Sequence, residues 1–147
     1  MPVRYQLVID CADPDRMARF WAAALGYEPA PVPAGFASWN DYYRSLGVAE
    51  EDLTDGIDRI SDPAGHGPAI WFHAVPAAKV VKNRLHFDIR GGGDWLDPID
   101  IRRKRIDAEA SRLAALGATV YGPLSDDDPN FYAVGMQDPE GNEFDIN

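Results

Sequence analysis

The chain contains an internal repeat, in which one order of strand, helix and further strands is predicted twice. In the first half, Leu7–Asp10 leads into an apolar helix that ends at Leu25 and Gly26; in the second, Leu85–Asp88 leads into one that ends at Leu116 and Gly117. Neither unit can bury a whole sheet face alone, so the two are expected to pack together. The predicted fold class is α+β, with two tandem βαβββ units, helices outside, and a curved mixed sheet around a shared cleft.

The two halves also end alike, which indicates where the units begin and end. A turn sequence, Asp62–Gly65, precedes the apolar run Ala69–Phe72, and a second, Asp138–Asn142, precedes the final run Glu143–Ile146. Turn residues of this kind commonly precede a strand. We therefore predict one domain over 1–147, with unit one at about 1–76 and unit two at about 82–147.

Composition and charge exclude several classes of protein. The chain has 147 residues, of which 46% are apolar, and 14 basic side chains against 24 acidic ones give a formal charge of −10. This charge repels nucleic acid, and the basic run Arg102–Arg105 is interpreted as a solvated helix face. No apolar run approaches the ~20 residues of a membrane span. Cys11 is the only cysteine, so no intrachain disulfide forms and a cytoplasmic location is expected.

Helical periodicity locates the two helices of the repeat. Asp13 is a typical helix-capping residue and Pro14 suits the first helical position, so the first helix starts here. The second helix is predicted from near Pro98 to Leu116. Apolar residues recur at helical spacing in both helices. The predicted buried positions are Met17, Phe20, Trp21, Ala24 and Leu25 in the first helix, and Ile106, Ala110, Leu113 and Gly117 in the second.

Strand alternation indicates which polar residues share a face, because residues two apart in a strand point to the same side. Leu85, Phe87 and Ile89 are predicted on one side of their strand, with His86, Asp88 and Arg90 on the other. If the apolar sides lie under the helices, three strands present Gln6, His86 and Asp145 from their opposite faces. An imidazole, a carboxylate and an amide oxygen are competent ligands for a divalent ion.

Several motifs resemble those of one superfamily. The chain resembles the vicinal oxygen chelate superfamily, and in particular its glyoxalase-like branch (glyoxalase, bleomycin resistance and dioxygenase type). The resemblance spans nearly the whole chain and implies the fold more specifically than any reaction. The motifs that carry it are Asp13-Pro14, Phe20-Trp21, Leu25-Gly26-Tyr27, Val75-Pro76, Lys79, Lys82–Asp88 and Asp138–Phe144.

The resemblance implies a metal site with one ligand from each unit's first strand and one from the last strand. Matched by motif, these ligands are Gln6, His86 and Asp145, and His73 is a further candidate. Gln6 stands where a histidine is frequent, and Asp145 where a glutamate is frequent. The implied protein is a lyase or isomerase that uses Ni, Co, Zn, Mn or Fe. Glu143 lies near Asp145 on the same strand face, and proximity alone makes it a candidate base.

A second hypothesis stays open beside the first. The chain would then be a metal-free drug or metabolite binding protein of the same fold, with an aromatic pocket. A lid role and simple packing of a short helix, capped by Ser38 or Asn40, are both open for Trp39 and Tyr42, and Arg84 is a candidate for holding an anionic group. A homodimer fits either hypothesis, since open sheet edges suit a symmetric partner. The candidate pocket residues are Phe36, Trp39, Tyr42, Trp71, Arg84 and Tyr132.

Overall fold

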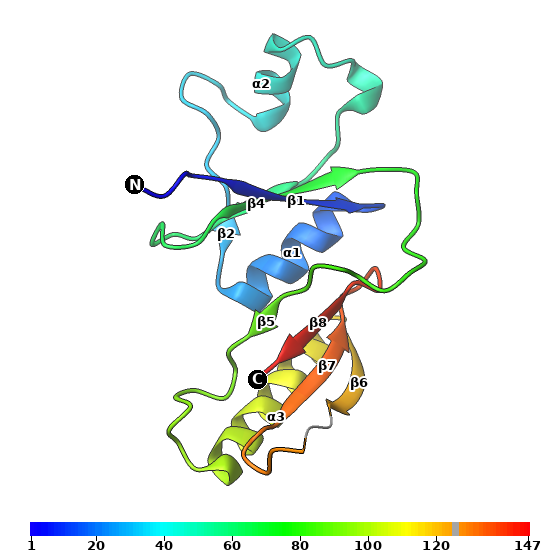
Figure 1. Ribbon diagram of the computed structural model, residues 1–147. Coiled ribbons are helices and arrows are strands. Elements are labelled where there is room, and N and C mark those ends of the chain that lie inside the picture. Colours follow the sequence, from blue (N-terminus) through cyan, green and yellow to red (C-terminus); the bar gives the residue numbers. More distant parts are fainter. Residues whose placement is uncertain (125–126) are drawn as a thin grey trace. The chain divides into compact units, whose positions relative to one another are not determined.

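The computed structural model describes residues 1–124 and 127–147, and the chain divides into two compact units, Met1–Pro76 and Ala77–Asn147. Each unit contains a four-stranded mixed sheet and a long helix packed against that sheet (Figure 1). The strand and helix order follows a βαβββ pattern in both units, with an insertion in the first. The α+β fold class predicted from the repeat is therefore confirmed.

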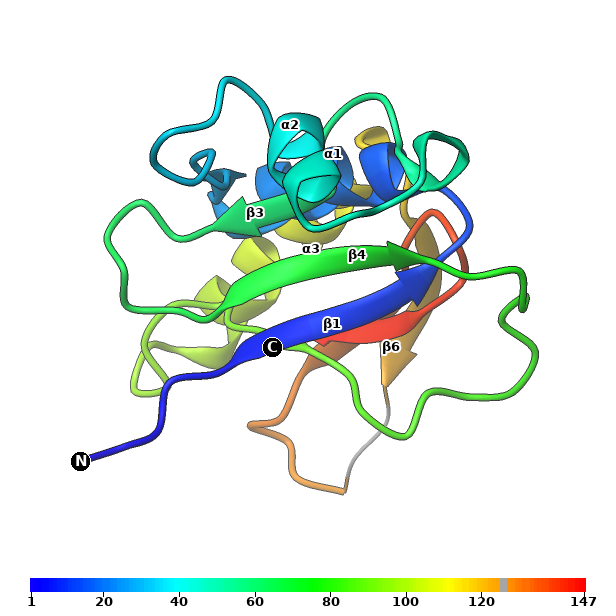
Figure 2. The same ribbon diagram turned by 90° about the horizontal axis from the view of Figure 1, so that it is seen from above.

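The sheet of the first unit has the order β1-β4-β3-β2. Strands β1 and β4 are parallel and lie side by side (Figure 2), and the other pairs are antiparallel. Because β1 pairs directly with β4, residues that are far apart in the sequence share one sheet face. The elements are β1 (Gln6–Cys11), α1 (Pro14–Leu25), β2 (Glu28–Pro29), β3 (Arg59–Ser61) and β4 (Ala69–Ala74).

Helix α1 begins and ends as its sequence predicts. The Asp13 side chain accepts a hydrogen bond from the backbone N–H of Arg16 at 3.0 Å, and Gly26 ends the helix in the left-handed region at φ 69°. The apolar stripe of α1 packs on one face of the sheet and forms the core of this unit. The core residues include Met17, Phe20, Trp21, Ile60, Ile70 and Phe72.

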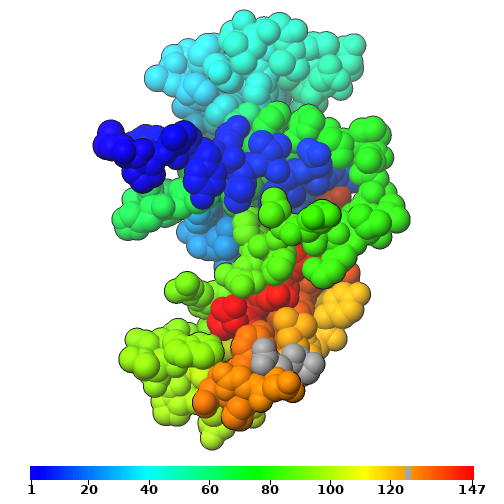
Figure 3. Space-filling view, viewed as in Figure 1, coloured from blue at the N-terminus to red at the C-terminus, as the bar shows by residue number. Residues whose placement is uncertain are grey.

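The insertion between β2 and β3 carries helix α2 (Trp39–Ser45) and a short 3-10 helix, η1 (Glu50–Asp52). Ser38 caps α2, because its Oγ accepts from the backbone N–H of Asp41 at 3.0 Å. Helix α2 lies on the side of the sheet opposite α1 (Figure 1), and the insertion stands over β1 in the space-filling view (Figure 3). None of its residues is fully buried. The insertion therefore lies over the sheet face that α1 leaves open, without sealing it.

The second unit repeats this arrangement with the sheet order β5-β8-β7-β6, in which β5 and β8 are parallel. Three of the four residues predicted on the buried line of its helix, Ile106, Ala110 and Leu113, pack against the sheet; the fourth, Gly117, lies beyond the end of the helix and is exposed. The elements are β5 (Asp88–Ile89), α3 (Ile99–Ala115), β6 (Thr119–Leu124), β7 (Ala133–Gln137) and β8 (Glu143–Ile146).

Two further expectations for the second unit were wrong. The Leu85 side chain is 88% exposed, because the strand is paired only at Asp88 and Ile89 and does not carry Leu85 under the helix. Arg102 is only 5% exposed, although the basic run was expected to be solvated. Its guanidinium donates to the carbonyls of Asp97 at 3.0 Å and Asn130 at 2.7 Å, so it joins two loops to α3.

Over residues 1–124 and 127–147, no helix combines the length and apolar character needed to cross a membrane.

Candidate metal and small-molecule sites

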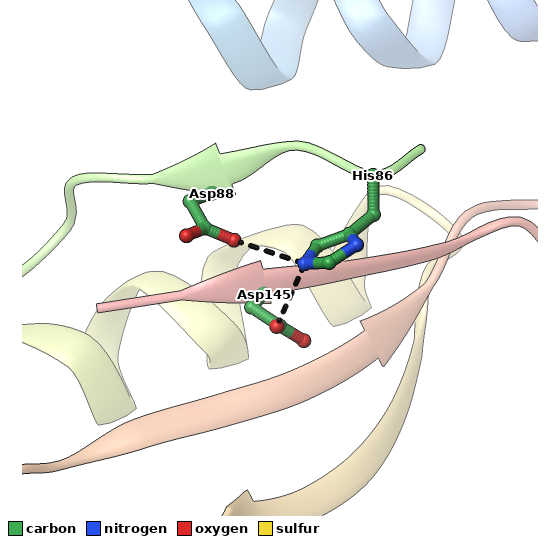
Figure 4. Close-up of side chains that lie close together, drawn as sticks. All are labelled: His86, Asp88 and Asp145. Carbon is green, nitrogen blue, oxygen red and sulfur yellow. Dashed lines mark ion pairs between the residues drawn. The ribbon is translucent and has the colours of Figure 1, made fainter. Parts of the chain in front are cut away.

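Three side chains of the second unit converge on the sheet face that α3 does not cover, and we call them the His86 cluster: His86, Asp88 and Asp145. Parallel pairing sets Asp88 opposite Asp145, and His86 precedes Asp88 by two residues. His86 Nε2 lies 3.4 Å from Asp88 Oδ1 and 3.5 Å from Asp145 Oδ2 (Figure 4). The geometry thus brings two of the predicted ligands together and adds Asp88, which sequence reasoning had considered only as a neighbour of His86 on the same strand face.

The donor set of the His86 cluster fits a divalent metal ion. One ligand atom from each residue can be chosen so that all three lie within 4.8 Å of one another. Among the residues described, this is the only group of three or more histidine, cysteine or acidic side chains with that property. Imidazole nitrogen and carboxylate oxygen together suit ions such as Mn²⁺, Fe²⁺, Co²⁺, Ni²⁺ and Zn²⁺.

Electrostatics in the His86 cluster favour the approach of a cation. Burial raises the pKa of the Asp145 carboxyl, and the negative charge of Asp88 raises it further, while the neighbouring His86 and Lys82 lower it. A half-buried carboxylate beside a second one is stabilised by any added positive charge. A bound divalent ion would supply that charge directly.

Glu143 lies two residues before Asp145, and its carboxylate is already engaged. It accepts from the backbone N–H of Asn83 at 3.0 Å and pairs with Lys79 Nζ at 3.0 Å. The Asn83 hydrogen bond is the largest contribution that lowers the Glu143 pKa to about 2, and Lys79 lowers it further. A carboxylate with so low a pKa is a weak proton acceptor at neutral pH.

The two candidate ligands of the first unit have partners of their own. Gln6 Oε1 accepts from Arg59 Nη1 at 3.3 Å. His73 Nδ1 lies 3.1 Å from Asp10 Oδ1, and the His73 ring contacts Trp71 with centroids 4.8 Å apart. Strand register explains the contact between His73 and Asp10, because β1 pairs with β4 through Asp10 opposite His73. Gln6 and Asp10 were predicted on the same face of their strand. Gln6 contacts Arg59 of β3, and Asp10 contacts His73 of β4.

The first unit contains a cavity of about 680 Å³ between the sheet and the α2 insertion, and we call it the Arg59 cavity. Its lining includes Trp71, Tyr43, Asp58, Arg59 and His73. Sequence reasoning named Trp71 as a pocket residue but missed Tyr43, Asp58 and Arg59 as pocket residues. The alternation around the buried Ile60 would have set Arg59 on the open face of the sheet.

The other predicted pocket residues fall into two groups. Phe36, Trp39 and Tyr42 form an aromatic cluster, with ring centroids 5.2 Å apart for Phe36 and Tyr42 and 5.8 Å for Trp39 and Tyr42. Trp39 also donates from its indole Nε1 to the carbonyl of Ala30 at 3.1 Å, which anchors α2. These contacts show that α2 packs through its aromatic residues.

In the second unit, Arg84 is exposed and the Tyr132 hydroxyl donates to Asp107 Oδ1 at 2.7 Å. The guanidinium of Arg103 lies over the Tyr132 ring, 5.3 Å from its centroid. The Asp107 hydrogen bond raises the pKa of Tyr132. Both contacts anchor Tyr132 to helix α3, so its ring is held by that helix.

Comparison with known proteins gives one family and a set of structures with the same fold. The profile of a family described as a glyoxalase-like domain matches residues 6–147. No curated protein matches the chain. A glyoxalase/bleomycin resistance protein/dioxygenase family enzyme from Burkholderia phytofirmans superposes with a TM-score of 0.55 at 18% identity, covering 96% of this chain and 94% of that one.

Two further solved structures carry names that refer to specific functions. A variant of the fosfomycin resistance protein FosX from Listeria monocytogenes, in complex with Mn(II) and a dihydroxypropylphosphonic acid, gives a TM-score of 0.59 at 10% identity over 99% of this chain and 91% of that one. An oxidase, ChaP-H2, superposes with a TM-score of 0.51 at 18% identity, covering 99% of this chain and 93% of that one. At these identities the likeness is one of fold.

Proposed function

The chain belongs to the glyoxalase-like domain family, and we propose on that basis that the protein is a small-molecule enzyme of the vicinal oxygen chelate type, with a divalent ion held by the His86 cluster. The observation that carries this proposal is the convergence of Asp88 and Asp145 on one nitrogen of His86, at 3.4 and 3.5 Å. Two carboxylates and an imidazole aimed at one point are a suitable ligand set for such an ion.

A bound divalent ion would polarise neighbouring oxygens of a substrate and stabilise an enolate-like anion, which is the chemistry of a lyase or isomerase. The chain's own residues prepare the site. His86 supplies a neutral nitrogen, and the carboxylates of Asp88 and Asp145 supply negative charge. Gln6 remains a predicted ligand, and it would first have to give up the hydrogen bond from Arg59.

Contacts around the cluster support its use as a site. Lys79 and Asn83 hold Glu143 at the start of β8, two residues from Asp145, and so keep the segment before His86 close to that strand. Side chains held by their surroundings bind metal with less loss of conformational entropy. Because Glu143 is engaged in these contacts, the proton acceptor in this proposal is a group other than Glu143.

The first experiment measures the metal content of protein purified without chelators or immobilised nickel, and then the melting temperature with Mn, Ni, Co, Zn and Fe(II). Binding of a metal to the folded state alone stabilises it by about 2.7 kcal/mol when the metal is present at 100 times its dissociation constant. We expect a selective rise in melting temperature with one or more of these ions.

The matched variants are His86→Ala and His66→Ala. His66 is an exposed loop residue outside the His86 cluster. We expect His86→Ala to abolish the metal-dependent shift and His66→Ala to leave it unchanged. A His86→Ala protein that still takes up one metal per chain would contradict the proposal.

A second candidate function is metal-free binding of a small molecule, and the Arg59 cavity is the observation that favours it. A cavity of about 680 Å³ with an indole wall is suited to a drug-sized ligand. In this case, ligands quench tryptophan fluorescence equally with and without chelator. Quenching that disappears on addition of chelator would favour the metal enzyme.

A homodimer accompanies either function in this proposal. Each sheet has two edge strands, β1 and β2 in the first unit and β5 and β6 in the second. Edge strands present backbone groups with which a second copy can pair. Light scattering during size-exclusion chromatography measures the mass directly, and a mass of one chain would remove the dimer from the proposal.

A further inference from the structure

Arg59 holds an unusual position on the open face of the first sheet. It begins β3 and pairs with Trp71 of β4, while the next residue, Ile60, points into the core on the opposite face and is fully buried. The side chain of Arg59 therefore extends into the space beneath the α2 insertion, where it lines the Arg59 cavity.

The guanidinium of Arg59 is held in one orientation by its neighbours. Its carbon lies 4.6 Å from the ring centroid of Trp71 and 4.9 Å from that of Trp39. Arg59 Nε donates to the Tyr43 hydroxyl at 2.9 Å, and Nη1 donates to Gln6 Oε1 at 3.3 Å. Two indoles and two neutral acceptors thus fix the plane of the group before any ligand arrives.

The charge of Arg59 has no direct counter-ion. Within residues 1–124 and 127–147, no carboxylate oxygen lies within 4.0 Å of its guanidinium, whereas Arg19, Arg44, Arg105 and Arg112 all have carboxylate partners. What sets Arg59 apart is that its guanidinium lacks a carboxylate partner while it lines a cavity between two indoles. A half-buried charge without a counter-ion is stabilised by an added anion.

Asp58 does not fill this role, because its carboxylate is directed to other donors. Asp58 Oδ2 accepts from the Tyr43 hydroxyl at 3.0 Å and from Trp71 Nε1 at 3.2 Å. Its link to Arg59 runs through the Tyr43 hydroxyl, which accepts from Arg59 and donates to Asp58. Arg59 Nη2 donates to no group in the part of the chain that the structure describes.

We propose that the Arg59 cavity binds a small organic carboxylate, whose carboxylate group accepts hydrogen bonds from Arg59 and whose flat apolar body lies against Trp71. The planar fork of a guanidinium matches a carboxylate in geometry as well as in charge. His73 lines the same cavity and contacts Trp71, which leaves a polar group beside the ligand body. This inference specifies the ligand class of the second candidate function and is independent of the His86 cluster.

The opposite preference, for a cation, would arise if Glu51 and Asp52 governed the cavity. Both are exposed residues of η1 that also line the cavity. Exposed carboxylates are screened by solvent and salt, whereas Arg59 is half-buried between two indoles. Arg59 is therefore expected to decide the sign of charge that the cavity prefers.

Calorimetric titration with three probes of one shape tests the proposal: cinnamate, the neutral cinnamamide and the cationic cinnamylamine. Chelator is present throughout, so that metal binding cannot contribute. We expect cinnamate to bind once per chain, at least about tenfold more tightly than either of the other probes. Tighter binding of cinnamylamine, or no binding of cinnamate at millimolar concentration, would overturn the proposal.

Variants locate the interaction. Arg59→Gln should remove the preference for cinnamate over cinnamamide, and Arg59→Lys, which keeps the charge but loses the planar fork, should retain part of it. Arg44→Gln is the control, since Arg44 belongs to α2 and is already paired with Asp41 and Glu50. If Arg59→Gln does not fold, Arg59→Lys carries the test. Cinnamate binding that neither variant weakens would overturn the proposal.

The proposed metal site at the His86 cluster and the proposed carboxylate site at the Arg59 cavity can be tested independently. His86→Ala should bind cinnamate as tightly as the unchanged protein, because His86 is not part of the Arg59 cavity. Loss of metal uptake with cinnamate binding intact would support the separation of the sites. Loss of cinnamate binding in His86→Ala would contradict the assignment of the ligand to Arg59.

Discussion

Asp88 and Asp145 face each other across the parallel pair β5 and β8, and their carboxylates lie 3.4 and 3.5 Å from the same nitrogen of His86. Like charges set directly opposite each other in a sheet are destabilising. His86 offsets part of this repulsion, and a bound cation would offset it further. Sites that bind ligands often cost stability in this way.

Replacement of Asp145 with asparagine separates these two effects. Burial and Asp88 raise the pKa of Asp145, so the folded state disfavours its ionised form. Stability is then lost as pH rises through the raised pKa. We expect Asp145→Asn to stabilise the metal-free protein by about 0.5–1 kcal/mol at pH 7 and to weaken metal binding at least about tenfold.

Denaturant unfolding at pH 7 with chelator, together with metal titration, measures both quantities. Asp55→Asn is a matched control, because Asp55 is exposed and lies outside the His86 cluster. If Asp145→Asn is no more stable than the unchanged protein at pH 7, the repulsion between Asp88 and Asp145 does not affect stability.

The low pKa of Glu143 predicts a pH dependence of the opposite sign. Its folded pKa of about 2 lies below the ordinary value of 4.5, so its contribution to stability is present above the ordinary value and is lost as pH falls toward 2. We expect Glu143→Gln to destabilise the protein by about 1–2 kcal/mol at pH 7, through loss of the charged hydrogen bonds to Asn83 and Lys79.

Unfolding of Glu143→Gln and the unchanged protein at pH 7 and near pH 2 makes the comparison. The difference between them should shrink at the lower pH, where Glu143 itself begins to be protonated. Glu51→Gln, at an exposed glutamate of η1, should show no comparable difference at either pH. A difference in stability that is the same at both pH values would mean that the charge of Glu143 does not contribute to it.

Arg102 should matter more for stability than its neighbours in the basic run. It is buried, bonds two loop carbonyls, and lies 4.4 Å from the ring centroid of Trp95. Arg102→Ala should cost about 2–3 kcal/mol, because the carbonyls of Asp97 and Asn130 lose their donors. Chemical denaturation measures this cost, and the exposed Lys104→Ala is expected to change stability by less than about 0.5 kcal/mol. Equal effects would contradict the structural role.

Asp15 should hold the segment before β3 against helix α1. Its carboxylate accepts from the backbone N–H of Ile57 at 2.9 Å and from Arg19 Nε at 2.8 Å, and both contacts lower its pKa. Asp15→Ala should cost about 1–2 kcal/mol, since it leaves the Ile57 donor without this acceptor. Thermal unfolding measures the change, with Arg19→Ala as the comparison. The Arg19 variant should lose less, since its ion pair is exposed.

Much of the fold and part of the candidate site could be predicted from local patterns. The cap at Asp13 follows from residue type, Ser38 was one of two candidate caps beside Asn40, and most of the buried lines of α1 and α3 follow from helical periodicity. Alternation also put His86, Asp88 and Asp145 on the open faces of their strands. These features depend on neighbours within a few residues, so the order of residues contains the information needed.

Partners that come from distant parts of the chain could not be predicted in this way. Leu85 was expected under the helix, but the strand begins only at Asp88 and leaves Leu85 exposed. Arg102 was expected in solvent, but it is buried and donates hydrogen bonds to two loops. In the sequence Arg59 is an ordinary strand residue, and only the folded structure places its guanidinium between Trp39 and Trp71. Each outcome depends on which segments pack together.

The sequence by itself determined the order of two βαβββ units, the Asp13 cap of α1, and the side of each strand on which the polar residues lie, because these follow from residue type and from backbone periods of two and 3.6 residues. Only the tertiary structure decided that Asp88 would face Asp145 and that Arg59 would lie between two indoles without a carboxylate partner. Pairing between strands and the packing of an insertion over a sheet are nonlocal, and many registers satisfy the same local pattern until the core selects one.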